Sequence, residues 1–236
     1  MRYRLLEEFR GLFEGKRYLH RKSTLGDWVA LHLYEDLVTL NRSKKFVERV
    51  ESGHRVLQGN NTVQGVKARR GDGTFGERLP GQIPVSDRGY KVQRAPIATV
   101  EIGVEVKIVA KAMLKQIDRV CGDLLRQAKE FGRAGGQPIA VAIAGINHAA
   151  EYVSFEGNRS FPTTGRSGFL HPIQEAAKAE VHLREKVQPQ LEHFLVLRFK
   201  ATNIAPYPFE WVNQEQTVRD YGAMLVRVSA AYERSF

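Results

Sequence analysis

Three charged residues alternate with apolar ones in residues 100–109, VEIGVEVKIV. Apolar side chains fill the even positions from 102 to 108, and a period of two is that of a β-strand. Glu101, Glu105 and Lys107 therefore share the opposite face. By strand rise, Glu105 and Lys107 are about 6.6 Å apart and can reach one small object, whereas Glu101 and Glu105 are about 13 Å apart and cannot share one ion.

A carboxylate and a lysine at this spacing suit metal-dependent hydrolysis of a phosphodiester. The carboxylate of Glu105 would hold Mg²⁺, and Lys107 would orient or deprotonate the attacking water and neutralise phosphate charge. A second carboxylate must come from another element. The alternative is a solvated strand face, where a Glu–Lys pair contributes a few tenths of a kcal/mol, roughly. Spacing alone leaves both open.

A second candidate acid lies on the helix predicted to begin at Thr24. Glu35 falls between Leu31 and Val38 on one apolar face. A carboxylate in such a stripe needs a partner or a cation, because burying it alone is costly.

Strands and helices are predicted to alternate along the chain. Short strands are expected at 54–59, 62–70 and 83–92, and the Gly-rich segment 69–82 is interpreted as a hairpin connection. The strand at 97–110 leads into a helix at 111–131. A continuously apolar strand at 139–147, covered on both faces, follows. A polar-aromatic loop at 148–172, a helix at 173–194, a strand at 194–201 and a last helix after Asn213 complete an α/β or α+β core.

The order of these elements resembles the PD-(D/E)xK nuclease superfamily over residues 27–148. The resemblance comprises a helix with Glu35, a hairpin, an acid near IPVSD, the Glu105-Val106-Lys107 signature and a strand VAIAGIN. The helix between the signature and that strand carries Lys115-Gln116. The resemblance implies a central mixed β-sheet flanked by helices, with a restriction-endonuclease-like core and an α/β C-terminal extension. The expected divisions are a basic helical segment (1–26), this core (27–148) and a C-terminal part (149–236) that completes the same domain.

The resemblance also implies roles for individual residues. A first acid and Glu105 would bind Mg²⁺ or Mn²⁺, Lys107 would assist the water, Glu35 would join the metal site and Gln116 would be an accessory catalytic residue. Where the family has an aspartate in mid-strand, this chain has Pro84. Asp87 is the predicted first acid, and Glu77 and Glu101 are its substitutes.

The net charge of +10 is unevenly distributed. Residues 1–60 have an excess of four basic residues and 61–135 an excess of six, whereas 136–236 are balanced. A local basic surplus is typical of a phosphate-binding face, although it can also serve solubility. Predicted contacts to nucleic acid, DNA rather than RNA, are Lys111, Lys115, Arg119, Arg159 and Arg166. The last two alternate with aromatic residues, a pattern that suits base stacking or packing of the loop onto the core.

Composition limits the other classes. The single cysteine, Cys121, excludes a disulfide framework and a cysteine-based zinc cluster. The absence of a long apolar run and of a signal-peptide layout predicts a soluble cytoplasmic protein without a membrane partner.

The leading hypothesis is a magnesium-dependent endonuclease of a defence or repair system, and the resemblance makes a homodimer or a partner subunit plausible. The alternatives are a non-catalytic nucleic-acid-binding module and a protein-interaction subunit.

Overall fold

A six-stranded mixed sheet forms the centre of the protein. The structure, a computed structural model, describes residues 2–19, 24–58, 71–111, 113–134, 136–163 and 170–236. The strand order is β1-β2-β3-β4-β7-β8. β1, β2 and β3 are antiparallel, β3, β4 and β7 are parallel, and β8 is antiparallel to β7. The strands are β1 Arg55–Gln58, β2 Gly73–Glu77, β3 Ile102–Val109, β4 Ile139–Asn147, β7 His193–Ala201 and β8 Phe209–Trp211.

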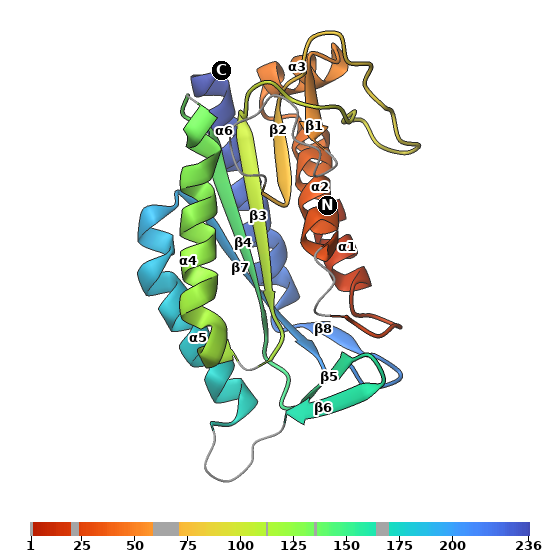
Figure 1. Cartoon of the computed structure of the whole chain (residues 1–236), viewed down its shortest axis with the longest axis vertical. Helices are drawn as coiled ribbons and strands as arrows, with labels where there is room; N and C mark the ends of the chain where they lie inside the picture. Colours follow the sequence, from red (N-terminus) through yellow and green to blue (C-terminus); the bar gives the residue numbers. More distant parts are fainter. Residues whose placement is uncertain (1, 20–23, 59–70, 112, 135, 164–169) are drawn as a thin grey trace.

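Helices cover both faces of this sheet, as Figure 1 shows. The even residues of β3, such as Val104 and Val106, pack into one core with residues of α1, α2 and α6. Val109 belongs to a second core with α4 and α5 on the other face. The predicted α/β fold with a mixed sheet between helices is therefore confirmed. The helices are α1 Arg4–Gly11, α2 Thr24–Leu40, α3 Lys44–Glu51, α4 Met113–Phe131, α5 Pro172–Lys186 and α6 Gln214–Ser235, with short 3-10 turns η1 Gly132–Ala134 and η2 Gln188–Gln190.

The strand with the charged face is central, as its context predicts. β3 pairs with β2 on one side and with β4 on the other. β4 is buried on both faces, which confirms the interpretation of its continuous apolar run. None of the described helices has the length and apolarity that crossing a membrane requires.

Three predicted segments differ from the structure. The Gly-rich segment 69–82 contains the strand β2. Its Gly76 lies where neighbouring backbone comes close, since a Cβ there would be 1.9 Å from the Thr99 carbonyl oxygen. The predicted loop 148–172 contains the hairpin β5 Tyr152–Glu156 and β6 Arg159–Thr163, turned by Gly157 at positive φ. In segment 83–92 only an isolated bridge, Val85 to Arg94, forms. The predicted strand 62–70 lies outside the described residues.

Candidate active site

Asp72 lies beside the Glu105-Val106-Lys107 signature. The last residue pair between β2 and β3 is Gly73 with Val104, so β3 continues beyond the start of β2. Asp72 immediately precedes β2, and its Oδ2 accepts a hydrogen bond of 2.7 Å from the Val106 backbone N–H. The carboxylate thus takes the place that a strand carbonyl would occupy, and it lies against the middle residue of the signature.

Close packing fixes the backbone around Asp72. A Cβ on Gly71 would lie 2.5 Å from the Phe131 ring, and one on Gly103 would lie 2.4 Å from the same ring. The Tyr34 hydroxyl lies 3.1 and 3.2 Å from the carbonyl oxygens of Gly73 and Ile102 and shares its one hydrogen between them. Phe131 of α4 and Tyr34 of α2 therefore hold the β2–β3 junction from both sides, and the position of Asp72 is set by the core.

Glu105 and Lys107 form an ion pair on the face of β3 that carries α4. Lys107 Nζ donates to Glu105 Oε1. The Glu105 side chain is only 9% exposed and that of Lys107 is 28% exposed, so the carboxylate is the more deeply buried partner. Charge–charge interaction with Asp123 of α4 affects both residues, as expected for side chains that face this helix.

Burial and neighbouring charges shift the pKa values of all three side chains. Burial, followed by the charge of Glu105, raises the pKa of Asp72 to about 7. Burial also raises the pKa of Glu105, against the opposing effect of Lys107. Burial lowers the pKa of Lys107, but the charge and hydrogen bond of Glu105 outweigh this and raise it overall. Near neutral pH the lysine is therefore an ammonium, and the acid pair has an affinity for a further proton or cation.

The predicted first acid, Asp87, does not lie in this site. It forms an ion pair with Arg94, and Arg94 bridges to Leu57 of β1. Since β2 separates β1 from β3, that segment is at least two strand spacings, about 9.6 Å, from β3. Asp72 therefore replaces Asp87 in the candidate site. Its signal in the sequence was an acid at the start of a short strand, which the flanking glycines concealed.

The substitutes for Asp87 have structural partners instead. Glu77 is an exposed residue at the end of β2, 4.0 Å from an Arg55 nitrogen. Glu101 is buried and interacts with Arg55, Arg49 and the Tyr232 hydroxyl. The expectation that Glu101 and Glu105 serve different partners agrees with this placement.

Glu35 is buried, as its apolar stripe predicts, but its partners are not those of a metal ligand. Its carboxylate accepts hydrogen bonds from the backbone N–H groups of Lys91 and Val92, and it pairs with Arg4 at 3.3 Å. It thereby anchors the segment that follows Asp87. The α2 acid whose charge reaches Asp72 is instead Asp27, next to Gly26, whose Cβ position is 2.7 Å from Asp72 Oδ2.

Four other predicted residues gather at the end of β3. Gln116 Nε2 donates to the Lys111 carbonyl at 3.4 Å, and both line a pocket together with Lys115 and Arg119. Arg159 is the exposed first residue of β6, opposite Glu156. Arg166 lies outside the described residues.

The donor set at Asp72 and Glu105 suits a hard divalent cation. No group of three or more His, Cys, Asp or Glu side chains in the described part of the chain is arranged to hold a metal ion. Mg²⁺ does not require such a cage, since it keeps several waters and binds through one or two carboxylates. Burial raises the pKa of both acids, and the charge of Glu105 adds to the effect on Asp72, so a bound cation would compensate their charges.

Comparisons with protein-family models, with curated proteins and with solved structures return no match.

Proposed function

We propose that the protein is a metal-dependent nuclease that hydrolyses phosphodiester bonds, with Asp72, Glu105 and Lys107 as its catalytic residues. The observation that carries this proposal is the convergence of a buried acid, a half-buried acid and a lysine on one short segment of β3. Structural ion pairs normally balance their charges, as Glu101 does with two arginines. Here two neighbouring acids compete for one lysine, a feature of sites that bind a cation or transfer a proton.

The side chains have distinct roles in this proposal. Asp72 and Glu105 would hold Mg²⁺ or Mn²⁺, which when bound supplies Lewis-acid stabilisation and lowers the pKa of coordinated water. Lys107, whose pKa is raised, stays protonated and donates to a phosphate oxygen or orients the water.

The proposed substrate is a nucleic acid, with DNA preferred over RNA. Three cationic residues, Lys111, Lys115 and Arg119, line a pocket just beyond the same strand. The basic surplus of the whole chain lies in residues 1–135, which include both the acid pair and this pocket. A strand of phosphates bound by these cations would pass the acid pair.

The test is cleavage of supercoiled plasmid, linear duplex, single-stranded DNA and RNA with Mg²⁺ or Mn²⁺. We expect Asp72→Asn, Glu105→Gln and Lys107→Ala each to lower the rate by at least about 100-fold. Asp87→Asn is the matched control, because it removes an acid with a lowered pKa that pairs only with Arg94 in the described residues. Its rate should equal that of the wild type.

Two outcomes would contradict the proposal. Cleavage that survives both Asp72→Asn and Glu105→Gln would place the chemistry elsewhere. Metal-independent, salt-sensitive binding with no cleavage of any substrate would favour the non-catalytic nucleic-acid-binding module on the same fold.

A further inference from the structure

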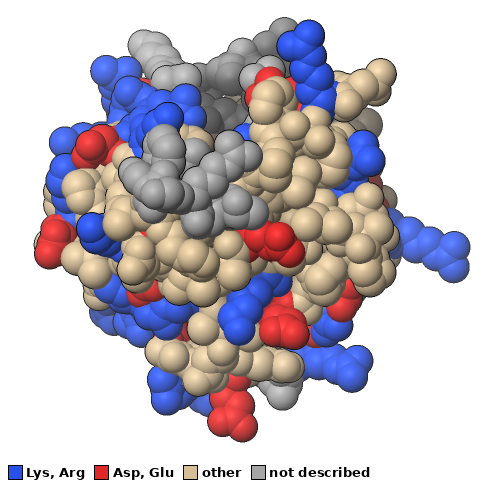
Figure 2. Space-filling view, turned by 90° about the horizontal axis from the view of Figure 1, so that it is seen from below, with Lys and Arg blue, Asp and Glu red and all other residues tan. Residues whose placement is uncertain are grey.

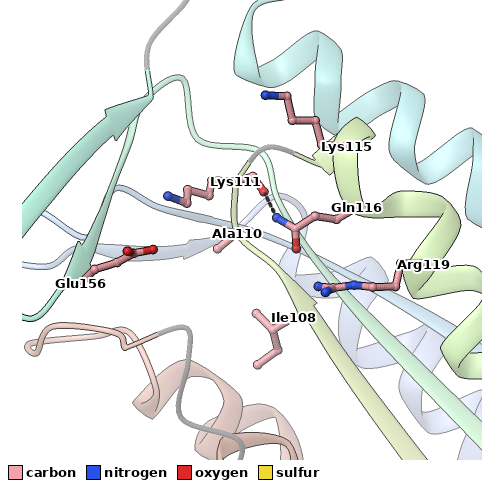
Figure 3. Close-up of a pocket in the computed structure, with 7 residues that line it drawn as sticks. All are labelled: Ile108, Ala110, Lys111, Lys115, Gln116, Arg119 and Glu156. Carbon is pink, nitrogen blue, oxygen red and sulfur yellow. Dashed lines mark hydrogen bonds between the residues drawn. The ribbon is translucent and has the colours of Figure 1, made fainter.

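A pocket of about 610 Å³ lies where β3 ends and α4 begins. Figure 3 shows Gln116 and Arg119 reaching from α4 over the end of β3, with Ile108 beneath them. Lys111 extends towards the hairpin strand β5, from which Glu156 points back into the pocket. The volume is within the range of small-ligand sites, roughly 300–1,000 Å³, and is sufficient for one or two nucleotides but not for a duplex.

The cations of this pocket are available to a ligand. Lys115 and Arg119 are exposed, and within the described part of the chain they have no ion pair or hydrogen bond. Lys111 Nζ is partly committed, since it donates to the Ser154 hydroxyl of β5. Two unpaired cations spaced i, i+4 lie on one side of a helix and can bind neighbouring phosphate oxygens of one strand.

An aromatic ring stands beside one of the cations, next to the residues that line the pocket. Phe161 of β6 is 41% exposed, and Lys111 Nζ is 5.6 Å from its ring centre. An exposed ring next to a phosphate-binding group is the combination that proteins use to bind unpaired nucleotides, because any base can stack on it. A paired base, whose faces are covered by its neighbours in the duplex, cannot reach such a ring.

The end of the molecule that holds the pocket has no continuous basic surface among the described residues. Seen from this end of the molecule, Lys and Arg side chains are interspersed with acids and with a broad uncharged area (Figure 2). Within the pocket itself, Glu156 lies on the hairpin side and the cations Lys115 and Arg119 lie on α4. A ligand with its phosphate against α4 would place an uncharged part, such as a base, towards the hairpin.

The pocket lies along the same strand as the acid pair. Ile108 follows Glu105 by three residues along β3, a rise of about 10 Å, but its side chain is on the opposite face, so a bound chain would pass around the edge of β3 to contact both. A chain with its scissile phosphate at Glu105 and Lys107 would reach the pocket within a few nucleotides. The pocket would thus receive the unpaired nucleotides beside the cleavage position.

We infer that this pocket binds single-stranded nucleic acid, with phosphates on Lys115 and Arg119 and a base against Phe161. The inference rests on the proposed function and specifies its substrate: single strands, or duplexes with an unpaired end, rather than continuous duplex.

Fluorescence anisotropy with full-length Glu105→Gln protein in EDTA measures binding apart from cleavage. The probes are a labelled single-stranded DNA 12-mer, its duplex and the RNA 12-mer of the same sequence. The single strand should bind at least about tenfold more tightly than the duplex. Adding Lys115→Gln with Arg119→Gln, or Phe161→Ala, should weaken single-strand binding about tenfold or more. Lys129→Gln, an exposed lysine farther along α4, is the control and should change nothing.

Equal affinity for single strand and duplex, or equal losses in the pocket variants and in Lys129→Gln, would overturn the inference. A tighter RNA 12-mer would keep the pocket but change the preferred substrate. The two proposals fail separately. If the pocket variants lose binding and the wild type cleaves no substrate, the pocket is retained and the nuclease is rejected. If the wild type cleaves and the pocket variants bind as it does, the nuclease is retained and the pocket is rejected.

Discussion

Two glutamates on one strand, Glu101 and Glu105, illustrate how surroundings decide what a carboxylate can do. Glu101 is compensated by Arg55, Arg49 and a tyrosine hydroxyl, so nothing in its environment calls for a further cation. Glu105 shares one lysine with a second acid, Asp72. Two acids and one ammonium leave a deficit of positive charge, and this deficit is the property on which the proposed metal site depends.

Without a metal ion, this deficit of positive charge should lower the stability of the folded protein at neutral and higher pH. The pKa of Asp72 is raised from 3.8 to about 7, so the folded state binds a proton more tightly than the unfolded chain does. The stability that this proton provides is fully present below about pH 4 and is lost as the pH rises towards 7. In EDTA, Asp72→Asn should therefore melt higher than the wild type at pH 8, by about 3 °C, because the amide keeps an acceptor for the Val106 N–H. The difference should shrink towards pH 4.

The same titration governs metal binding. Mg²⁺ competes with the proton for the acid pair, so it should raise the melting temperature of the wild type more at pH 8 than at pH 5.5. Asp72→Asn should lose this stabilisation and Asp87→Asn should retain it. Thermal melts at both pH values, with and without Mg²⁺, make the check. A wild type whose melting temperature does not respond to Mg²⁺ at pH 8 would contradict the assignment of these acids.

At the scale of elements, the site depends on how closely β2 approaches its neighbours. A Cβ on Gly76 would lie 1.9 Å from the Thr99 carbonyl oxygen, and backbone cannot yield as a flexible side chain can. Gly76→Ala should therefore lower the free energy of unfolding by about 3 kcal/mol and displace the strand that begins beside Asp72. Nuclease activity should fall with it.

Gly122 is the matched control, since nothing lies within 4 Å of its Cβ position. Gly122→Ala, in the interior of α4, should raise the free energy of unfolding by about 0.5–1 kcal/mol. Urea denaturation of both variants measures the two effects. If Gly76→Ala is as stable as the wild type, β2 does not approach Thr99 as closely as the structure has it.

The difference between these glycines also explains what the sequence could and could not predict. β3 and α4 follow from periodicity, because their apolar residues repeat with the period of the element that buries them, and β4 follows from its continuous apolar run. β2 has no such pattern. Two of its five residues are glycine, for reasons that involve Thr99 and Ala30, which are distant in sequence.

The candidate site was predictable to the same extent. Glu105 and Lys107 lie on a strand whose alternation shows which residues share a face, and the structure pairs them. Their partner acid depends on where a neighbouring strand begins, which is a tertiary property. Asp87 was predicted because it lies three residues after Pro84, which occupies the position where the resemblance implies an acid, but the carboxylate of Asp87 pairs with Arg94. Glu35 was predicted to need a partner, and the structure supplies backbone N–H groups.

At the scale of the whole molecule, the net charge of +10 allows two different ways of binding nucleic acid. Diffuse attraction by the whole basic half would involve many phosphates and would respond steeply to salt, with little dependence on any one residue. Binding in the pocket at the end of β3 would involve only its three cations, Lys111, Lys115 and Arg119. The two modes predict different slopes of log K against log salt concentration.

For a single strand the slope is about −0.7 for each phosphate neutralised, so Lys115 and Arg119 should give a slope of about −1.4, and a contribution from Lys111 would bring it to about −2 at most. Lys115→Gln should make it less steep by about 0.7, whereas Lys129→Gln should leave it unchanged. Anisotropy titrations of the single-stranded 12-mer between about 50 and 200 mM salt cover the range in which this term dominates. A slope well beyond −2 that neither substitution alters would mean that the basic half as a whole binds the strand. A slope that changes in Lys115→Gln and not in Lys129→Gln would instead show that the single strand binds in the pocket at the end of β3, the strand that carries Glu105.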